Sequence, residues 1–276
     1  KNIKRILHYI NTQYWKRLKN DLKYHLGKET ASKVDFLICG AQKAGTTALD
    51  TYLRSHPEIC MAEFKEVNYF DREKYFLYGK PDYSIYHSFF KPLPGQRIWG
   101  ESTPIYMYWY QVPRRIWFYN PGMKIIIILR NPIERAFSHW NMQRERGFDP
   151  LPFQEALKME EMRQKESLPW QNRRFSYTDR GFYTEQIRRL RTYFPKKQLL
   201  LLRNLDLRHK PQWVLDQICS FLGVSPMEVE PLTRHQRKYP VEMQPEEKAY
   251  LKDLYQWEVR ELEAITGWDC RDWLEY

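Results

Sequence analysis

The sequence lacks long hydrophobic runs. Across 276 residues, the longest unbroken aliphatic stretch is the five residues from Ile125 to Leu129. A membrane-spanning helix needs roughly 20 apolar residues, and no hydrophobic leader opens the chain. Both absences argue against an integral membrane protein. Because residue 1 is lysine and not methionine, an anchor upstream stays an open alternative.

Cysteine is also scarce. The four cysteines are far apart, with no CxxC pair and no Cys/His cluster at zinc spacing: Cys39, Cys60, Cys219 and Cys270. This argues against a disulfide scaffold and against a structural metal, so we expect no metal. Scattered thiols without a leader favour the reducing cytoplasm, with membrane association as a further option. A lumenal, Golgi-type form stays open because of the missing initiator methionine.

Positive charge is abundant and uneven. The chain carries 45 Lys+Arg against 34 Asp+Glu, a formal net charge of +11. Residues 1–30 hold eight of the basic residues and two acidic ones, which is +6 of that total. Apolar residues recur there every three or four positions, at Ile3, Leu7, Ile10, Tyr14, Leu18, Leu22 and Leu26. This pattern predicts a basic amphipathic helix over 1–30. It would either bind an anionic membrane surface or a polyanionic ligand, or cover a flank of the domain as a solvated helix.

Residues 31–276 read as one domain in which strands and helices alternate. The chain is 42% hydrophobic and 16% aromatic, enough to bury a large core. Strands are expected at 34–39, 97–99, 125–129 and 198–202, and helices at 50–55, 104–119, 133–146, 153–166, 181–194, 211–222 and 245–266. The fully apolar strand at 125–129 is typical of a parallel sheet buried on both faces. We therefore predict a three-layer, P-loop-like α/β domain with a central parallel sheet flanked by helices.

The segment Gly40 to Thr47 joins the first strand to the first helix and carries the strongest chemical signal. Backbone N–H groups in such a loop, with the positive end of a helix behind them, form a cradle for phosphate or sulfate. The candidate anion-binding residues are Gln42, Lys43, Ala44, Gly45, Thr46 and Thr47. A nucleoside triphosphatase loop has lysine directly after its second glycine, but Thr46 stands there. The alternative is a tight turn whose glycine and threonines only cap the helix.

The stretch from Phe36 to Leu49 resembles the 5′-phosphosulfate loop of sulfotransferases that use 3′-phosphoadenosine 5′-phosphosulfate (PAPS), most closely the heparan sulfate N- and O-sulfotransferases. The stretch from Ile125 to Ser138 resembles their second motif, a strand ending in arginine with a serine eight residues later. The resemblance implies that Arg130 and Ser138 bind the 3′-phosphate. An arginine fork and a hydroxyl are suitable donors for a phosphate dianion. Without the first loop, such a pair would more often be structural.

Three further segments extend the resemblance. Lys65 to Asp71 is similar to the family segment that bears the catalytic base, which falls on Glu66. Gly100 to Tyr106 is similar to the segment that follows, with Ser102 where the family has lysine, and it implies acceptor contacts at Glu101 and Ser102. Thr233 to Met243 resembles the loop that closes over the cofactor and implies contacts from Gln236, Arg237, Lys238 and Tyr239. Arg180 and Tyr183 lie where family members have an acceptor-side or a cofactor-side turn, and they are assigned to acceptor binding.

These assignments predict an enzyme that moves a sulfuryl group from PAPS, releasing 3′-phosphoadenosine 5′-phosphate (PAP), to a hydroxyl or amine. The expected acceptor is a saccharide or another small metabolite. In-line transfer depends on positioning and on charge stabilisation. Lys43 is placed to neutralise charge on the leaving oxygen, and Glu66 can act as general base. Without the resemblance, a surface ion pair with Lys65 or Arg72 would be the ordinary role of Glu66.

Two other function classes stay open. One is a nucleotide or nucleoside kinase with an atypical phosphate loop, which the missing Gly-Lys-Thr/Ser order disfavours. The other is a non-enzymatic polyanion-binding module, for which the net charge of +11 is the only support. We expect no nucleic-acid partner. The sequence leaves open the acceptor, the choice between O- and N-sulfation, and the oligomeric state.

Overall fold

The computed structural model describes residues 33–77, 81–232 and 239–275. These residues fall into two compact units. The sheet unit comprises 33–129 and 189–232, and the helical unit comprises 130–188 and 239–275. The basic helix expected over 1–30 lies outside the described residues.

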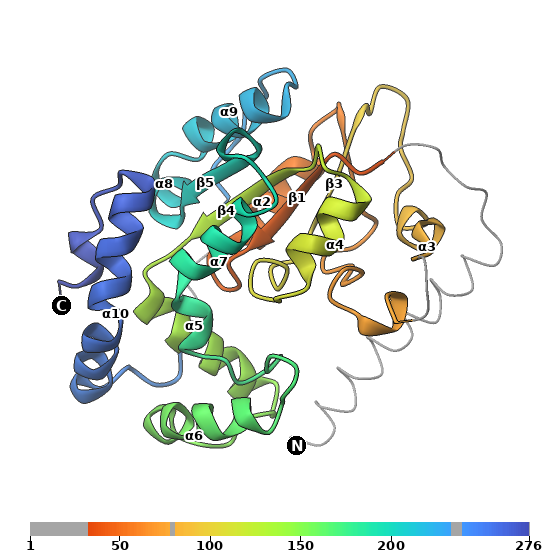
Figure 1. Cartoon of the computed structure of the whole chain (residues 1–276). Coiled ribbons are helices and arrows are strands. Elements are labelled where there is room, and N and C mark those ends of the chain that lie inside the picture. The colour runs from red at the N-terminus through yellow and green to blue at the C-terminus, as the bar shows by residue number, and fades with distance from the viewer. Residues whose placement is uncertain (1–32, 78–80, 233–238, 276) are drawn as a thin grey trace. The chain divides into compact units, whose positions relative to one another are not determined.

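The sheet unit is built on five parallel strands in the order β2-β3-β1-β4-β5 (Figure 1). Their bounds are β1 Phe36–Gly40, β2 Ile59–Met61, β3 Ile98–Ser102, β4 Lys124–Leu129 and β5 Leu199–Arg203. The sequence predicted four of these strands. It missed β2, because three residues are too few to show a periodicity. The predicted central parallel sheet is confirmed.

The core of this unit lies around the two central strands. Every residue of β1 is buried, and so are the five aliphatic residues of β4. Burial on both faces explains why these strands are apolar without alternation. Phe36 of β1 pairs with Gly100 of β3, and a Cβ on that glycine would lie 2.2 Å from the Phe36 ring. Gly100 is therefore required for the two strands to pair.

Helices flank the sheet, as predicted. Their bounds are α2 Thr46–Arg54, α3 Tyr83–His87, α4 Val112–Tyr119, α8 Asn204–His209 and α9 Pro211–Leu222, with single 3-10 turns at Glu73–Tyr75 and Lys196–Gln198. Helix α2 packs on β1, β2 and β3, while α8 and α9 pack on β5. No helix in the described part of the chain is long and apolar enough to cross a membrane.

The helix expected over 104–119 is wrong in its first half. Helix α4 begins only at Val112, with a proline in its first turn. Before it, the chain forms turns, and the Met107 N–H donates to the carbonyl of Cys39 at 2.9 Å. This bond to the end of β1 takes the Met107 N–H away from any helix. A tertiary contact thus overrides the local pattern.

The helical unit contains α5 Pro132–Glu145, α6 Phe153–Lys165 and α10 Pro245–Thr266, with 3-10 turns at Asp179–Gly181 and Arg271–Trp273. Helix α7, Tyr183–Arg191, starts in this unit and ends in the sheet unit. Helix α5 packs against α6, α10 and the turn Asp179–Gly181. Gln244 and Glu247 form a capping box at the start of α10, and Gly267 ends that helix at φ 75°.

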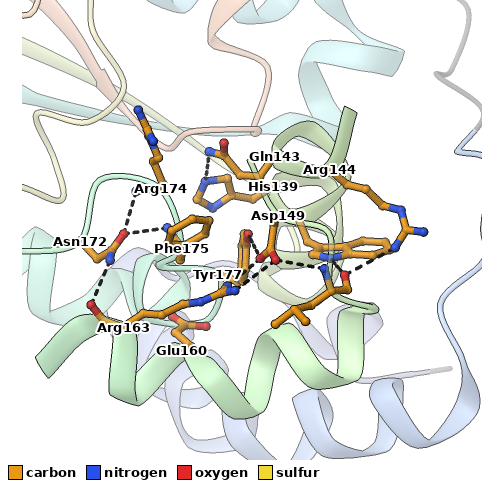
Figure 2. Close-up of polar contacts among 12 residues, drawn as sticks. His139, Gln143, Arg144, Asp149, Glu160, Arg163, Asn172, Arg174, Phe175 and Tyr177 are labelled. Atoms are coloured by element: carbon orange, nitrogen blue, oxygen red, sulfur yellow. Dashed lines mark hydrogen bonds and ion pairs between the residues drawn. The ribbon is translucent and has the colours of Figure 1, made fainter. Parts of the chain in front are cut away.

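A buried polar network fixes the segment between α6 and α7 (Figure 2). The Asp149 carboxylate, wholly buried, accepts hydrogen bonds from Arg163 Nη1 at 2.7 Å and from the Tyr177 hydroxyl at 2.7 Å. Burial would raise the pKa of Asp149, but these hydrogen bonds outweigh it and lower the pKa. Glu160 accepts the backbone N–H groups of Thr178 and Asp179 at 2.8 to 3.0 Å, while burial raises its pKa to about 7. Two carboxylates therefore hold the segment that leads into α7, Asp149 through the Tyr177 side chain and Glu160 through the backbone.

Candidate active site

The predicted catalytic residues lie in loops that follow two parallel strands of the sheet, β1 for Lys43 and β2 for Glu66. Lys43 comes after β1, and the backbone N–H of Glu66 donates to the Ser102 carbonyl at the end of β3, at 2.8 Å. Because β1 and β3 are adjacent and parallel, both loops are at the carboxyl edge of the sheet. Open α/β sheets bind their ligands at this edge. The sheet unit thus brings Lys43 and Glu66 to one edge.

The loop between β1 and α2 is held in shape by backbone bonds. The Ala41 N–H donates to the Ile128 carbonyl of β4 at 2.7 Å, and the Ala44 N–H closes a turn on the Ala41 carbonyl at 3.1 Å. Asn204, the first residue of α8, donates from Nδ2 to the Ala44 carbonyl at 2.7 Å. These three bonds fix the loop before any ligand binds.

Gly45 ends this loop in a conformation that favours glycine. Its φ is 109°, and a Cβ there would lie 2.8 Å from Asn204 Nδ2. Helix α2 starts at the next residue, and no acidic residue lies in its first turn. The first N–H groups of a helix have no acceptor within it and carry the positive end of the dipole. The loop and α2 therefore fit an anion such as the 5′-phosphosulfate of PAPS.

Left-handed backbone marks both predicted catalytic residues. Among the non-glycine residues that the structure describes, positive φ occurs at Lys43 (72°), Glu66 (64°) and Asn68 (56°). Such residues are uncommon, and each carries a conformational cost of about 1 kcal/mol or more. Backbone outliers of this kind cluster at active sites. The three outliers thus lie at the loops that the sequence had singled out.

The Glu66 carboxylate is accessible. Its side chain is 47% exposed, and Oε1 lies 3.0 Å from Lys65 Nζ. Asn68 donates from Nδ2 to the Glu66 carbonyl, and its own N–H points to Thr103 Oγ1 at 3.4 Å. These contacts hold the loop, and they leave the carboxylate at the surface, where an acceptor can reach it.

Glu101 and Ser102, at the end of β3, are buried. One Glu101 oxygen accepts the Tyr86 hydroxyl at 3.0 Å, and the other accepts Thr103 Oγ1 at 2.6 Å. Burial raises the pKa of Glu101 to about 7, and the nearby Asp71 charge adds a smaller increase. Ser102 Oγ is buried without a hydrogen-bond partner among the described residues. Glu101 is therefore a residue of the buried core. Its position in the motif did not predict this burial.

In the helical unit, the two predicted 3′-phosphate residues are each joined to another predicted residue. Arg130 lies directly after β4, and its Nε and Nη2 are both 2.8 Å from Glu134 Oε2. The Tyr183 hydroxyl donates to the Arg130 carbonyl at 2.8 Å. The Tyr239 hydroxyl donates to Ser138 Oγ at 2.7 Å. This unit therefore organises Arg130 and Ser138 through two tyrosines.

The remaining predicted residues have other positions. Arg180 is buried and donates to Ser176 Oγ at 2.8 Å and to the Arg173 carbonyl at 2.9 Å, within its own segment. Gln236, Arg237 and Lys238 lie outside the described residues. No group of three His, Cys, Asp or Glu side chains with metal-binding geometry occurs in the described ranges.

The sequence prediction missed two residues that shape this site. Asn204 donates a hydrogen bond to the Ala44 carbonyl, although the two residues are 160 positions apart in the sequence. Asp71 is buried close to Glu101. Asn204 had a usable signal: it is a polar residue directly after strand β5, at the edge where ligands bind. Asp71 had none beyond its place in the segment that contains Glu66.

The fold and these loops define a sulfotransferase. The sulfotransferase domain family matches residues 33–250, and the chain belongs to that family. The resemblance seen in the motifs is thereby confirmed.

Curated relatives point the same way. The chain is 35% identical over 204 residues to the mouse bifunctional heparan sulfate N-deacetylase/N-sulfotransferase 3, and 32% identical over 203 residues to human enzyme 2 of that type. Each match covers 69% of this chain and 22% of the relative. The chain thus spans about a fifth of these relatives. A Dictyostelium discoideum relative, 34% identical over 107 residues, is a membrane-associated sulfotransferase.

Solved structures agree on the fold. A sulfotransferase from Alicyclobacillus acidocaldarius superposes with a TM-score of 0.77 at 30% identity, covering 89% of this chain and 100% of that one. The mouse sulfotransferase SULT7A1, complexed with PAP, has a TM-score of 0.51 at 14% identity, covering 83% of this chain and 86% of its own. The second likeness concerns the fold alone.

Proposed function

We propose that this chain transfers a sulfuryl group from PAPS to a hydroxyl or amine of an acceptor and releases PAP. The observation that carries the proposal is the preformed loop before α2, with Lys43 at positive φ and Gly45 against Asn204. It occurs in a chain of the sulfotransferase domain family.

Two sets of residues would bind the donor. In the sheet unit, the N–H groups of Lys43 to Thr47 and the hydroxyls of Thr46 and Thr47 would bind the 5′-phosphosulfate. In the helical unit, Arg130 and Ser138 would bind the 3′-phosphate, with charge-assisted and neutral hydrogen bonds. The segment 236–238 would complete the nucleotide contacts. PAPS supplies the sulfuryl group.

Two side chains would assist the transfer. The ammonium of Lys43 stabilises negative charge on the oxygen that leaves with PAP. The Glu66 carboxylate takes the proton that the acceptor hydroxyl or amine loses as it attacks. No metal has a role in this proposal.

The acceptor is proposed to be a saccharide or a related small molecule. Support comes from the relatives, which are heparan sulfate N-deacetylase/N-sulfotransferases. Ser102, Arg180 and Tyr183 were the predicted acceptor contacts; because all three are buried, we propose that they support the site and do not touch the acceptor. For Glu101, which is wholly buried, we propose an indirect part: it holds the Thr103 hydroxyl, to which the N–H of Asn68 in the Glu66 loop points.

Residues 31–276 form the catalytic domain in this proposal, and the basic segment 1–30 is a separate element. That segment holds +6 of the net charge, which suits peripheral contact with an anionic membrane from the cytoplasm. Sedimentation of the full chain with phosphatidylserine vesicles, compared with phosphatidylcholine vesicles, tests this contact. Equal sedimentation in both would contradict it.

Calorimetric titration separates the candidate functions. We expect the chain to bind PAP at least tenfold more tightly than ATP, because the loop lacks the Gly-Lys-Thr/Ser order. A preference for ATP would favour a kinase. Indifference to both nucleotides, with salt-sensitive binding of heparin or DNA, would favour a polyanion-binding module.

The assignment of Glu66 is tested by E66Q. We expect this variant to bind PAP as the wild type does and to lose at least 100-fold in transfer of ³⁵S from PAPS. The acceptors would be a saccharide panel that includes desulfated heparan sulfate. E63Q is the matched control, since Glu63 pairs with Lys91 at the surface. Near-normal turnover by E66Q would remove Glu66 from the mechanism.

A further inference from the structure

One hydrogen bond joins the C-terminal loop to the helix that carries Ser138. The Tyr239 hydroxyl lies 2.7 Å from Ser138 Oγ, on α5. Ser138 is 2% exposed, whereas Tyr239 is half-buried. Among the described residues, Tyr239 is the one recorded hydrogen-bond partner of the Ser138 side chain.

Packing fixes the phenol ring in place. Tyr239 meets Phe137 edge to face, with ring centroids 5.5 Å apart. Phe137 in turn stacks on Trp140 at 5.5 Å and meets the edge of Phe153 at 5.2 Å. Such aromatic pairs have defined geometries. The hydroxyl of Tyr239 is therefore directed at Ser138 by a rigid aromatic cluster on α5 and α6.

The direction of the bond determines what Ser138 can do. A phenol is a stronger acid than an alcohol and is therefore the better donor, so Tyr239 donates and Ser138 Oγ accepts. A serine hydroxyl has one proton to donate and two lone pairs. With a lone pair engaged by Tyr239, the Ser138 proton is available to a separate acceptor. Accepting one hydrogen bond also strengthens the bond that a hydroxyl donates.

We propose that Tyr239 is a positioning residue for the 3′-phosphate: it acts through Ser138, orienting and polarising that hydroxyl, and does not bind the nucleotide itself. This inference rests on the proposed function and differs from the direct cofactor contact that the motif implied for Tyr239. It makes the Tyr239–Ser138 pair a determinant of selectivity for adenosine nucleotides with a 3′-phosphate. Nucleotides without that group gain nothing from the pair.

A double-mutant cycle on nucleotide selectivity tests the proposal. The measured quantity is the ratio of the dissociation constants of adenosine 5′-monophosphate and PAP, by calorimetry, for the wild type, Y239F, S138A and the double variant. A hydrogen bond to a charged group contributes enough to change binding tenfold or more. We expect the ratio to fall at least tenfold in S138A and three- to tenfold in Y239F. The double variant should match S138A, and binding of adenosine 5′-monophosphate should be unchanged in all four.

Other outcomes overturn the inference. If the effects of Y239F and S138A multiply in the double variant, Tyr239 contacts the nucleotide directly. If Y239F weakens both nucleotides equally, or neither, its role is structural or absent. Phenylalanine keeps the ring on Phe137, and Y250F, at an exposed position of α10, is the control for loss of a tyrosine hydroxyl.

The cycle also separates this inference from the proposed function. A wild-type chain that does not prefer PAP over adenosine 5′-monophosphate contradicts the function itself. A wild-type chain that prefers PAP, with multiplying effects of the two substitutions, contradicts only the role of Tyr239. In steady state, Y239F should raise KM for PAPS and leave kcat within twofold of the wild type, because the 3′-phosphate takes no part in the bond that forms or the bond that breaks.

Discussion

At the scale of single residues, the two proposed catalytic side chains share an unusual backbone. Lys43 and Glu66 both have positive φ, and each lies in a loop tied to the end of a buried strand. A flexible chain would spend little time in these conformations. The fold therefore holds both residues in place before any ligand arrives, which suits catalysis by positioned charges.

Lys43 offers a direct test of charge stabilisation. In K43M, we expect kcat to fall about 100-fold or more, because one positive charge at the leaving oxygen contributes several kcal/mol in a closed site. PAP binding should weaken by less than tenfold. Single-turnover measurement with ³⁵S-labelled PAPS separates the two effects. K91M, which removes a surface lysine paired with Glu63, should match the wild type, and equal losses in both variants would contradict the assignment.

At the residue level, the sequence predicted the residues of the two catalytic loops but not the buried residues that hold these loops in place. Lys43 and Glu66 could be predicted from the sequence because each belongs to a short contiguous motif. Asn204 belongs to no such motif: its place directly after β5 was its one signal, and its hydrogen bond to Ala44 spans 160 residues. Glu101 belongs to a motif too, yet no local pattern tells a buried carboxylate from an exposed one. Burial is a property of the packed fold.

At the scale of elements, the loop between β1 and α2 and the start of α2 form one fixed structure. Gly45 gives the backbone its turn at φ 109° and leaves space for the Asn204 amide. Asn204 then anchors the Ala44 carbonyl. The helix N-terminus is thus held at a fixed place relative to β5 and α8, within the sheet unit. An anion bound there would meet N–H groups that need no rearrangement.

Two glycine substitutions separate crowding from backbone strain. G45A should lower the free energy of unfolding by more than about 1 kcal/mol, because alanine at positive φ is strained and its Cβ would crowd Asn204. G95A has a similar φ of 92° with no atom within 4 Å, so it reports the strain alone. Urea titration measures both.

The same pair of variants tests the loop as an anion site. PAP binding should weaken at least tenfold in G45A and stay unchanged in G95A. If the two variants lose equal stability and equal affinity, the contact with Asn204 has no special importance.

The prediction of strands and helices succeeded where burial requires a run of apolar residues. It failed where hydrogen bonds to distant segments determine the local structure. The strands β1, β4 and β5 were predicted from such runs. Residues 104–111 have a helix-compatible composition, but the Met107 N–H is bonded to Cys39 of β1. Strand β2 has only three residues and exists because it pairs with β3. Both differences arise from partners that are distant in sequence.

At the scale of the whole molecule, two buried carboxylic acids predict how stability depends on pH. Burial raises the pKa of Glu101 and of Glu160 to about 7, against 4.5 for an unperturbed glutamate. Between these values, the folded chain binds more protons than the unfolded chain. The free energy of unfolding therefore falls as pH rises through this window, by up to about 3 kcal/mol for each group.

Glutamine variants isolate this contribution. Urea unfolding at pH 5, 6, 7 and 8 should show that E101Q and E160Q lose less stability than the wild type between pH 5 and pH 8. E246Q, which changes an exposed residue of α10, should follow the wild type. A pH dependence that is identical in all four proteins would mean that neither buried carboxyl retains its proton.

The order of the strands along the chain also determines when each strand of the sheet leaves the ribosome. Strand β4 ends at Leu129, and its partner β5 starts at Leu199, with most of the helical unit encoded between them. At about 5–20 residues per second, a ribosome needs roughly 4 to 14 seconds for this interval. During that time β4, whose aliphatic residues form the centre of the finished sheet, has one edge without its partner. The nascent chain is therefore most prone to aggregation after β4 and before β5 emerges, which makes this interval the natural point for a chaperone to act.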